Sequence, residues 1–197
     1  MAILFTTACT SIEIAIDRVR NRVLRELSTK RADHAHRVAV TADAIARGAG
    51  VDPLRARLAG WAHDLCREWD GDGMCAYVDP KRYPPTEAER QHPVLCHGPA
   101  AATMLEREYA VSERDILEAV RWHSTGNAGI GRLGKVLYAA DYLEPGRRYT
   151  TEAFRAYALA RSLDGMVKAV LEHIRERNLS MSQETAALYE EVRGHVE

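Results

Sequence analysis

The spacing of apolar residues constrains the fold of this chain most, because it follows the repeat of an amphipathic helix through nearly the whole sequence. In the segment 32–48, for example, Val38, Ala42 and Ile45 follow one another at steps of four and three residues, which places them on one helix face. No segment shows convincingly the alternation of apolar and polar residues that is typical of a β-strand. The sequence therefore predicts an all-α fold.

Capping residues and prolines indicate where several helices begin and end. Asp52-Pro53 is a typical helix start, and Gly50 lies just after a helix. Glu144-Pro145 ends a later helix, because proline cannot continue the hydrogen-bond ladder. Ser112 precedes acidic residues as an N-cap would. We expect helices near residues 10–27, 32–48, 53–66, 97–108, 112–123, 132–143, 151–161, 163–177 and 183–193.

The segment 69–96 has the weakest helical pattern and contains prolines at positions 80, 84, 85 and 93. A connection of this length inside a compact domain is more often a lid or a binding loop than a linker. The sequence shows no internal repeat and no second domain. We therefore expect a single domain over residues 1–197, with a motif-bearing core at about 31–148 and C-terminal helices within 151–193.

The composition is that of an ordinary globular protein, with 46% hydrophobic and 28% charged residues. A formal net charge of −1 creates no overall field that would attract nucleic acid or an anionic membrane, so we expect neither as a partner. No apolar run approaches the roughly 20 residues that span a bilayer.

The apolar start has no basic residue before Arg18, which argues against a secretion signal. Because none of the four cysteines forms a CxxC pair, we expect reduced thiols and a cytoplasmic location.

Several ionisable residues lie on helix faces that are otherwise apolar. His34 precedes Val38 by four residues and shares its buried face, whereas His36 points roughly 200° away around the helix. His63 and Asp64 end a helix that is apolar nearly all round. By the same counting, the residues that we expect to point inward are His34, His63, Asp64, His97, His123 and Asp141.

A metal cluster is the partner that these inward residues need. An unpaired buried carboxylate costs several kcal/mol, and here two carboxylates lie beside four imidazoles. Each residue alone has a simpler explanation. A single inward histidine is more often hydrogen-bonded in the core, and Asp141 is about as well explained by a salt bridge to an arginine or by a helix cap. The six residues together favour metal binding.

These residues resemble the HD superfamily of metal-dependent phosphohydrolases, whose members take a histidine from one helix, a His-Asp doublet from the next and a distal aspartate. The resemblance is closer to one branch, the YqeK-type symmetrical bis(5′-nucleosyl)-tetraphosphatases. Five segments carry it in family order: Arg31–His34, His63-Asp64, Cys96–Ala100, Ala119–Gly126 and Tyr138–Arg147. The resemblance implies an HD-domain helical bundle.

The same resemblance implies a two-metal site in which Asp64 bridges the ions. One ion would be held by His34, His63 and Asp141, and the other by His97 and His123. Iron is the metal that the family favours, although nitrogen and oxygen ligands also suit manganese, cobalt or zinc. The implied reaction is attack by a metal-bridging hydroxide on diadenosine tetraphosphate, which yields two molecules of ADP.

Two arginines are our candidates for stabilising the negative charge of the leaving nucleotide, namely Arg67 and Arg147, and together with Asp64 they form the expected catalytic set. We expect Thr125 and Gly126 to lie beside the phosphates. The family usually carries lysine at the position of Arg67, so the geometry of phosphate binding differs here. Other polar residues are expected outside the metal site: His36, His92, Cys66, Cys96, His173 and His195.

Three other functions remain open from the sequence. The chain could be an HD-domain nucleotidase that acts on a mononucleotide, a nucleotide-binding module without catalysis, or a helical scaffold whose histidines are hydrogen-bonded in the core. The filled set of six candidate ligands argues against the module without catalysis, and metal content near zero would favour the scaffold. A homodimer also remains open.

Overall fold

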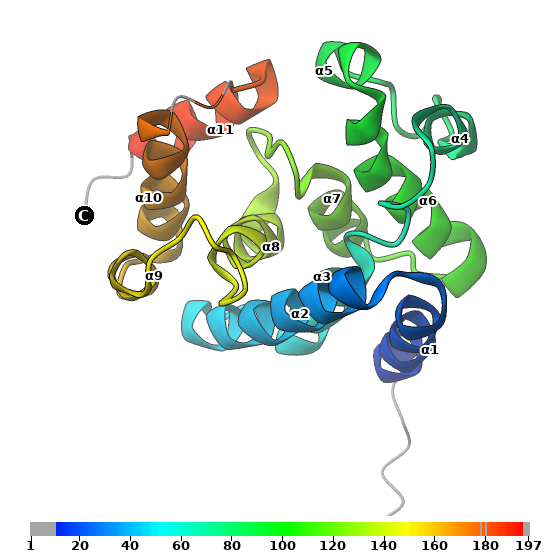
Figure 1. Cartoon of the computed structure of the whole chain (residues 1–197), viewed down its shortest axis with the longest axis horizontal. Coiled ribbons are helices and arrows are strands. Elements are labelled where there is room, and N and C mark those ends of the chain that lie inside the picture. Colours follow the sequence, from blue (N-terminus) through cyan, green and yellow to red (C-terminus); the bar gives the residue numbers. More distant parts are fainter. Residues whose placement is uncertain (1–10, 178, 180, 195–197) are drawn as a thin grey trace, which may run out of the picture.

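The computed structural model describes residues 11–177, 179 and 181–194, and all regular elements in this part of the chain are helices. Figure 1 shows their arrangement. The elements are α1 (Ser11–Glu26), α2 (Thr29–Ala49), α3 (Pro53–Ala62), α4 (Gly71–Tyr77), α5 (Glu87–Gln91), the 3₁₀ helix η1 (Pro93–Cys96), α6 (His97–Tyr109), α7 (Arg114–Trp122), α8 (Gly131–Leu143), α9 (Glu152–Leu159), α10 (Leu163–Glu176) and α11 (Gln183–Arg193). The expected all-α fold is confirmed.

Local capping explains several of the boundaries that the sequence predicts. The Asp52 carboxylate accepts hydrogen bonds from the first backbone N–H groups of α3, and Pro53 fills the first helical position. Gly50 ends α2 in the left-handed conformation, with φ of 64°. At Ser112 the prediction is wrong, because Glu113 is the N-cap residue of α7 and its side chain makes no capping bond.

Two further predictions differ from the structure. The helix expected at 53–66 ends at Ala62, and the residues after it form turns. The segment 69–96 contains α4, α5 and η1, which we had not expected. Side-chain caps at Asp70 and Thr86 begin α4 and α5. These helices have seven and five residues, so they are too short to show a helical repeat of apolar residues.

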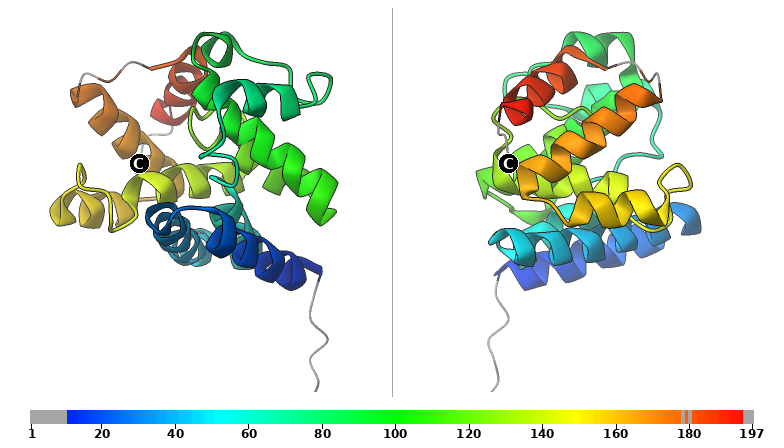
Figure 2. Two further views of the ribbon diagram at one scale, coloured as in Figure 1. Left: turned by 45° about the vertical axis from the view of Figure 1, so that its right-hand side comes forward. Right: turned by 90° about the vertical axis from the view of Figure 1, so that its left-hand side faces the viewer.

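Five helices meet in the middle of the molecule. Helix α2 packs against α3 and α8, while α7 packs against α6, α3 and α8. Figure 1 shows α9–α11 on one side of α8, and α4–α6 on the other side of α7. Figure 2 shows α1 and α2 along one face of the molecule, with α10 and α11 on another. None of the helices in the described ranges is long and apolar enough to cross a membrane.

Two glycines allow the central helices to approach closely. A Cβ atom at Gly60 would lie 2.5 Å from the Cα atom of Ala39, so only glycine fits where α3 crosses α2. A Cβ atom at Gly98 would lie 2.6 Å from the carbonyl oxygen of Arg121, where α6 meets the end of α7. Both glycines lie within three residues of a candidate metal ligand, so these crossings set the spacing of the site.

Candidate metal centre

The six residues that the sequence singles out come together between α2, α3, α6, α7 and α8. They lie at five places in the chain: within α2 and α8, in the turn after α3, at the first residue of α6, and just after α7. Five of them are buried, with at most 6% of their surface exposed, and Asp141 is half-buried. The list is His34, His63, Asp64, His97, His123 and Asp141.

One group of potential ligands consists of His34, His63 and Asp141. The Oδ1 atom of Asp141 lies 3.0 Å from Nε2 of His34 and 3.8 Å from Nε2 of His63. The two Nε2 atoms are 3.2 Å apart. The three donor atoms therefore converge on one point, as the ligands of a metal ion do.

A second group lies on the other side of Asp64. The Nε2 atoms of His97 and His123 are 3.0 Å apart, and they lie 3.4 Å and 3.8 Å from Oδ1 of Asp64. The other carboxylate oxygen, Oδ2, faces the first pair, at 3.9 Å from Nε2 of His34 and 3.7 Å from Nε2 of His63. Each oxygen of Asp64 thus faces one pair of imidazoles.

Hydrogen bonds at Nδ1 orient all four imidazole rings with Nε2 toward the centre of the site. The Nδ1 atom of His63 lies 2.7 Å from the carbonyl oxygen of Gly60, and that of His123 lies 2.8 Å from the carbonyl oxygen of Val120. His97 makes the same contact with Val94, and His34 makes it with a carboxylate oxygen of Glu144.

In a neutral ring whose Nδ1–H donates a hydrogen bond to an oxygen, Nε2 carries a lone pair. The facing lone pairs of His97 and His123, 3.0 Å apart, repel one another unless a cation or a hydrogen-bond donor lies between them. The donor chemistry of the site therefore fits metal ions.

Burial keeps the two rings of the second group neutral. It lowers the pKa of His97 to about 4, with the neighbouring His123 as the next cause. It lowers the pKa of His123 to about 4 as well, with His63 as the next cause. Burial opposes the ionisation of Asp64, but the nearby imidazoles lower the pKa of this carboxyl group to about 2. At neutral pH the second group thus offers two neutral imidazoles and a carboxylate, the forms that bind metals.

Arg147 contacts the site directly. Its Nε atom donates a hydrogen bond of 2.8 Å to the backbone oxygen of Asp141, and its guanidinium group pairs with the Asp141 carboxylate. The same group lies 3.3 Å from Nε2 of His34. Burial opposes the ionisation of Asp141, but the hydrogen bond from His34 and the charge of Arg147 hold the pKa of Asp141 well below its usual range. The arginine partner that was the alternative explanation for Asp141 is therefore present beside the imidazoles.

The other expected substrate contacts have different surroundings. Arg67 lies half-buried in the turn after Asp64, and its charge is among the causes that lower the pKa of His97, after burial and His123. The hydroxyl of Thr125 donates to the carbonyl oxygen of Gly126, and the carbonyl oxygen of Thr125 accepts a 2.6 Å bond from Thr185 of α11. Gly126 has φ of 64° and packs against α11. The Thr125-Gly126 turn therefore lies between the end of α7 and α11.

Three residues beside the site carry contacts to which the sequence assigns no role. The Oγ atom of Ser124 lies 3.0 Å from Nε2 of both His97 and His123. Glu144, with 1% of its surface exposed, orients His34 through the contact at Nδ1, which is 3.1 Å long. Arg31 donates a 3.1 Å hydrogen bond to Asp64. All three lie in the segments that carry the family resemblance, which was the available signal.

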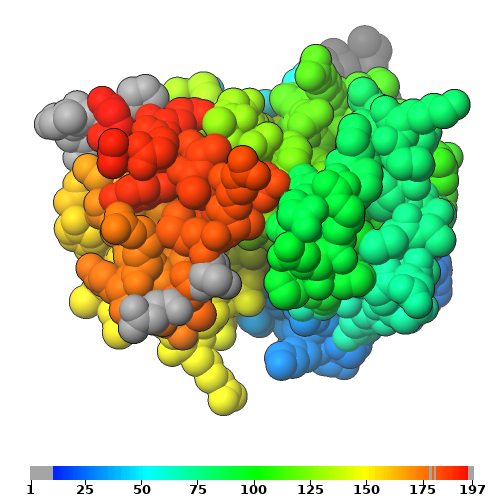
Figure 3. Space-filling view, turned by 90° about the horizontal axis from the view of Figure 1, so that it is seen from above, coloured from blue at the N-terminus to red at the C-terminus, as the bar shows by residue number. Residues whose placement is uncertain are grey.

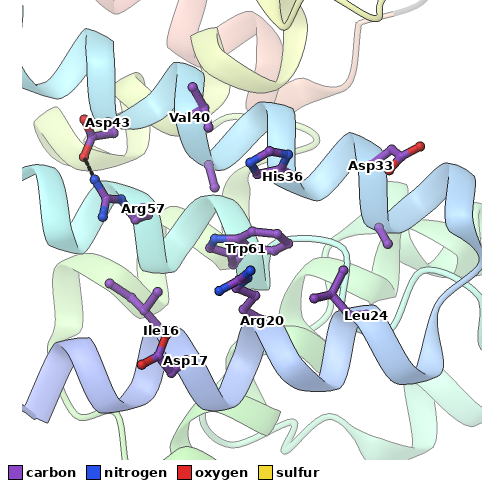
Figure 4. Close-up of a pocket in the computed structure, with 12 residues that line it drawn as sticks. Ile16, Asp17, Arg20, Leu24, Asp33, His36, Val40, Asp43, Arg57 and Trp61 are labelled. Carbon is purple, nitrogen blue, oxygen red and sulfur yellow. Dashed lines mark hydrogen bonds and ion pairs between the residues drawn. The ribbon is translucent and has the colours of Figure 1, made fainter.

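The remaining polar residues lie elsewhere, as far as the structure describes them. His36 points outward, as expected, and stacks on Trp61 with ring centroids 5.4 Å apart. Figure 4 shows the two rings in a groove of about 430 Å³ lined by residues of α1, α2 and α3. His92 is exposed before η1, and His173 contacts Tyr142. Cys9 and His195 lie outside the described residues.

Comparison with known proteins identifies the family. The family model of the HD domain matches residues 31–146. A relative from Staphylococcus aureus, named symmetrical bis(5′-nucleosyl)-tetraphosphatase, is 30% identical over 132 residues, which cover 67% of this chain and 68% of the relative. A relative from Bacillus subtilis with the same name is 33% identical over 127 residues, which cover 64% of this chain and 68% of the relative.

The fold has a counterpart among solved structures. A crystal structure of a predicted HD superfamily hydrolase involved in NAD metabolism, from Clostridium acetobutylicum, matches with a TM-score of 0.81. The match covers 91% of this chain and 97% of that chain, at 23% sequence identity, so it speaks for the fold. The family expected from the sequence is confirmed. The chain belongs to the HD-domain family and, within it, to the branch whose members are named symmetrical bis(5′-nucleosyl)-tetraphosphatases.

Proposed function

We propose that the chain hydrolyses diadenosine tetraphosphate symmetrically, with one water molecule consumed and two molecules of ADP formed. The observation that carries this proposal is the position of Asp64 between two imidazole pairs, with one carboxylate oxygen facing each pair. This arrangement supports a two-metal hydrolase. The substrate follows from the relatives, which are named for this reaction.

In this proposal the six residues hold two metal ions. His34, His63 and Asp141 would hold one ion, His97 and His123 would hold the other, and Asp64 would contribute to both. Iron is the expected metal, and manganese, cobalt and zinc also accept nitrogen and oxygen ligands. When bound, two such ions supply a water molecule of lowered pKa and neutralise phosphate oxygens.

The protein's own side chains bind and orient the polyphosphate. The guanidinium group of Arg67 has no hydrogen bond or ion pair with the described residues, so it is free to bind the phosphate group that leaves. The exposed hydroxyl of Ser124 is placed to donate a hydrogen bond to a phosphate oxygen. Arg147 stays charged and holds Asp141 in position.

The shape of the molecule is compatible with an elongated substrate. Figure 3 shows a hollow between the C-terminal helices, drawn in orange and red, and the green part of the chain. We also propose that the Thr125-Gly126 turn, which contacts α11, lies beside the phosphates. A lid function of the segment 69–96, a homodimer and a single domain over the whole chain also remain proposals.

Product analysis tests the proposal. Metal-loaded protein should convert diadenosine tetraphosphate to ADP alone and should contain close to two metal ions per chain. A mixture of AMP and ATP would contradict symmetrical cleavage, although the protein would still be a hydrolase. AMP, offered at the same concentration, should be hydrolysed at least 100-fold more slowly. A preference for AMP would favour the mononucleotidase instead.

A further inference from the structure

An aromatic cluster lies beside the metal centre, where α8, α9 and α10 meet. The cluster consists of Tyr142, Tyr149, Phe154 and His173. The ring centroids of Tyr142 and Tyr149 are 5.0 Å apart, and Phe154 stacks on His173 at 4.1 Å with an interplanar angle of 24°. All four side chains are only half-buried, so the cluster is not part of the closed core.

Arg147 connects the aromatic cluster to the metal centre. Its guanidinium carbon lies 5.7 Å from the centroid of the Tyr149 ring, while the same guanidinium group pairs with the carboxylate of Asp141. Tyr149 is therefore separated from a candidate metal ligand by a single side chain. A ligand whose phosphates reach the metal centre would bring its next chemical group to this ring.

A second arginine gives the aromatic cluster a positive charge. The guanidinium carbon of Arg177 lies 4.7 Å from the centroid of the Tyr149 ring. Arg177 is exposed and forms no ion pair with a carboxylate in the part of the chain that the structure describes. Arg177 also interacts with the hydroxyl of Tyr142. Arginines that lie next to aromatic rings and have no carboxylate partner bind anionic ligands that carry a planar group.

Contacts behind Tyr142 hold its ring in place. The hydroxyl of Tyr142 shares a 2.9 Å hydrogen bond with Nδ1 of His173, and His173 is itself stacked on Phe154. A ring that is already fixed loses little conformational freedom when a ligand stacks on it. Tyr142 thus gives Tyr149 a fixed aromatic neighbour, at 5.0 Å between ring centroids.

We propose that the aromatic cluster is a nucleoside-binding subsite, in which the base of one nucleotide half stacks on Tyr149 and Arg177 binds phosphate charge. The inference rests on the proposed function, because it takes the phosphates to lie at the metal centre. Every nucleobase has a π-face, so stacking of this kind holds a nucleoside without selecting one base strongly. The ring that stacks on the base is Tyr149, and Tyr142 packs against it at an interplanar angle of 50°.

Substitution of Tyr149 tests the subsite through binding. Calorimetry on the metal-loaded full chain compares ADP with inorganic pyrophosphate, which lacks the nucleoside. Tyr149→Ala should weaken ADP binding about tenfold, the typical loss for one base–aromatic stack, and should leave pyrophosphate binding unchanged. Tyr149→Leu, which keeps the bulk of the side chain, should show the same loss, and Tyr149→Phe should bind ADP like the wild type.

Tyr157→Ala is the matched control. Tyr157 is an exposed tyrosine of α9 with Arg161 at 4.1 Å from its ring centroid, so it repeats the Tyr–Arg pair away from Arg147. Removal of the Tyr157 side chain should change neither the affinity for ADP nor the affinity for pyrophosphate. Unchanged ADP binding in both Tyr149→Ala and Tyr149→Leu would overturn the subsite, and so would an equal loss for ADP and pyrophosphate.

The kinetics separate the two proposals. With diadenosine tetraphosphate, Tyr149→Ala should raise KM about tenfold and leave kcat within about twofold, because the reacting groups are untouched. Wild-type protein that binds ADP through Tyr149 but does not hydrolyse diadenosine tetraphosphate would contradict the proposed function and support the subsite. Normal hydrolysis with ADP binding that does not depend on Tyr149 would support the function and overturn the subsite.

Discussion

The Nε2 atoms of His97 and His123 lie 3.0 Å apart, and Nδ1 of each ring contacts a backbone carbonyl three residues earlier in the chain. The two rings are therefore fixed with their free nitrogens facing one another. Both facing atoms are acceptors in the neutral rings, and the hydroxyl of Ser124, 3.0 Å from each, can donate to only one of them, so hydrogen bonding alone does not explain the arrangement. A cation between them does.

Removal of one of these rings should therefore empty one metal position. In His123→Ala we expect the metal content to fall from about two ions per chain to about one, and hydrolysis to fall at least 100-fold. Elemental analysis and product formation on the same sample measure both. His36→Ala, which removes an exposed imidazole from the other face of α2, should keep both values. Two ions per chain in His123→Ala would contradict the proposed ligand set.

Glu144 should act on the metal through His34. Its carboxylate contacts Nδ1 of His34 at 3.1 Å and also accepts a hydrogen bond from Arg37. Loss of such a partner typically weakens metal binding 10–100-fold, and we expect Glu144→Gln to fall in this range. Competition with a chelator measures the affinity. Glu106→Gln, at a carboxylate that contacts Arg82 and Tyr83, is the control and should bind metal normally.

The stability of the metal-free protein should fall as the pH falls. His97 and His123 have pKa values of about 4 in the folded chain, whereas a histidine in the unfolded chain has a pKa near 6.5. Between these values the unfolded state binds protons that the folded state does not, so the free energy of unfolding decreases as the pH falls from about 6.5 to about 4. The loss is on the order of 3 kcal/mol for each ring.

His34 opposes part of this loss of stability, because its pKa is raised in the folded chain. Burial alone would lower the pKa of His34, but the hydrogen bonds to Asp141 and Glu144 outweigh burial. Urea unfolding in the presence of a chelator at pH 7, 5.5 and 4.5 measures the trend. A free energy of unfolding that stays constant or rises over this range would show that the rings are not buried in their neutral form.

The crossing of α2 and α3 should not tolerate a methyl group. In Gly60→Ala the new Cβ atom would lie 2.5 Å from the backbone of Ala39, so the helices must separate at a cost of about 1–3 kcal/mol. His34 and His63 would move apart with them, and metal affinity should fall.

Gly48→Ala is the matched control within α2, where nothing lies within 4 Å of the new atom. That variant should be more stable than the wild type by about 0.5–1 kcal/mol. Thermal unfolding and metal titration compare the two.

Arg67 should affect turnover and not metal content. Its side chain has no ion-pair partner among the described residues, and its charge is felt at His97. We expect Arg67→Ala to lower kcat about 10–100-fold with both metals retained, because a donor to the leaving phosphate is lost. Arg67→Lys should recover most of the rate. Loss of metal in Arg67→Ala would assign this residue a structural role instead.

Much of the candidate metal centre could be predicted because helical periodicity converts sequence spacing into the direction of each side chain. The interval of four residues between His34 and Val38 was enough to place His34 inward, and the structure finds it buried. The contact between His34 and Glu144 could not be read in this way. It joins residues 110 positions apart, and it depends on how α2 packs against the end of α8.

The missed helices have a different physical cause. Helices α4 and α5 owe their start to side-chain caps at Asp70 and Thr86, and they pack through few residues. A cap without a following apolar stripe is also typical of a turn. The end of α3 at Ala62 was likewise hidden, because the turn after it remains as apolar and buried as the helix.

Asp64 turns one oxygen toward each imidazole pair, and this geometry bears on how the proposed pair of ions would bind. The first ion to arrive would fix the carboxylate in the orientation that the second ion needs, so loading should be cooperative. At a limiting metal concentration, most molecules would then carry either no ion or two ions, and few would carry a single ion. When the metal supply changes, the fraction of active molecules would change, and the turnover rate of each active molecule would stay the same.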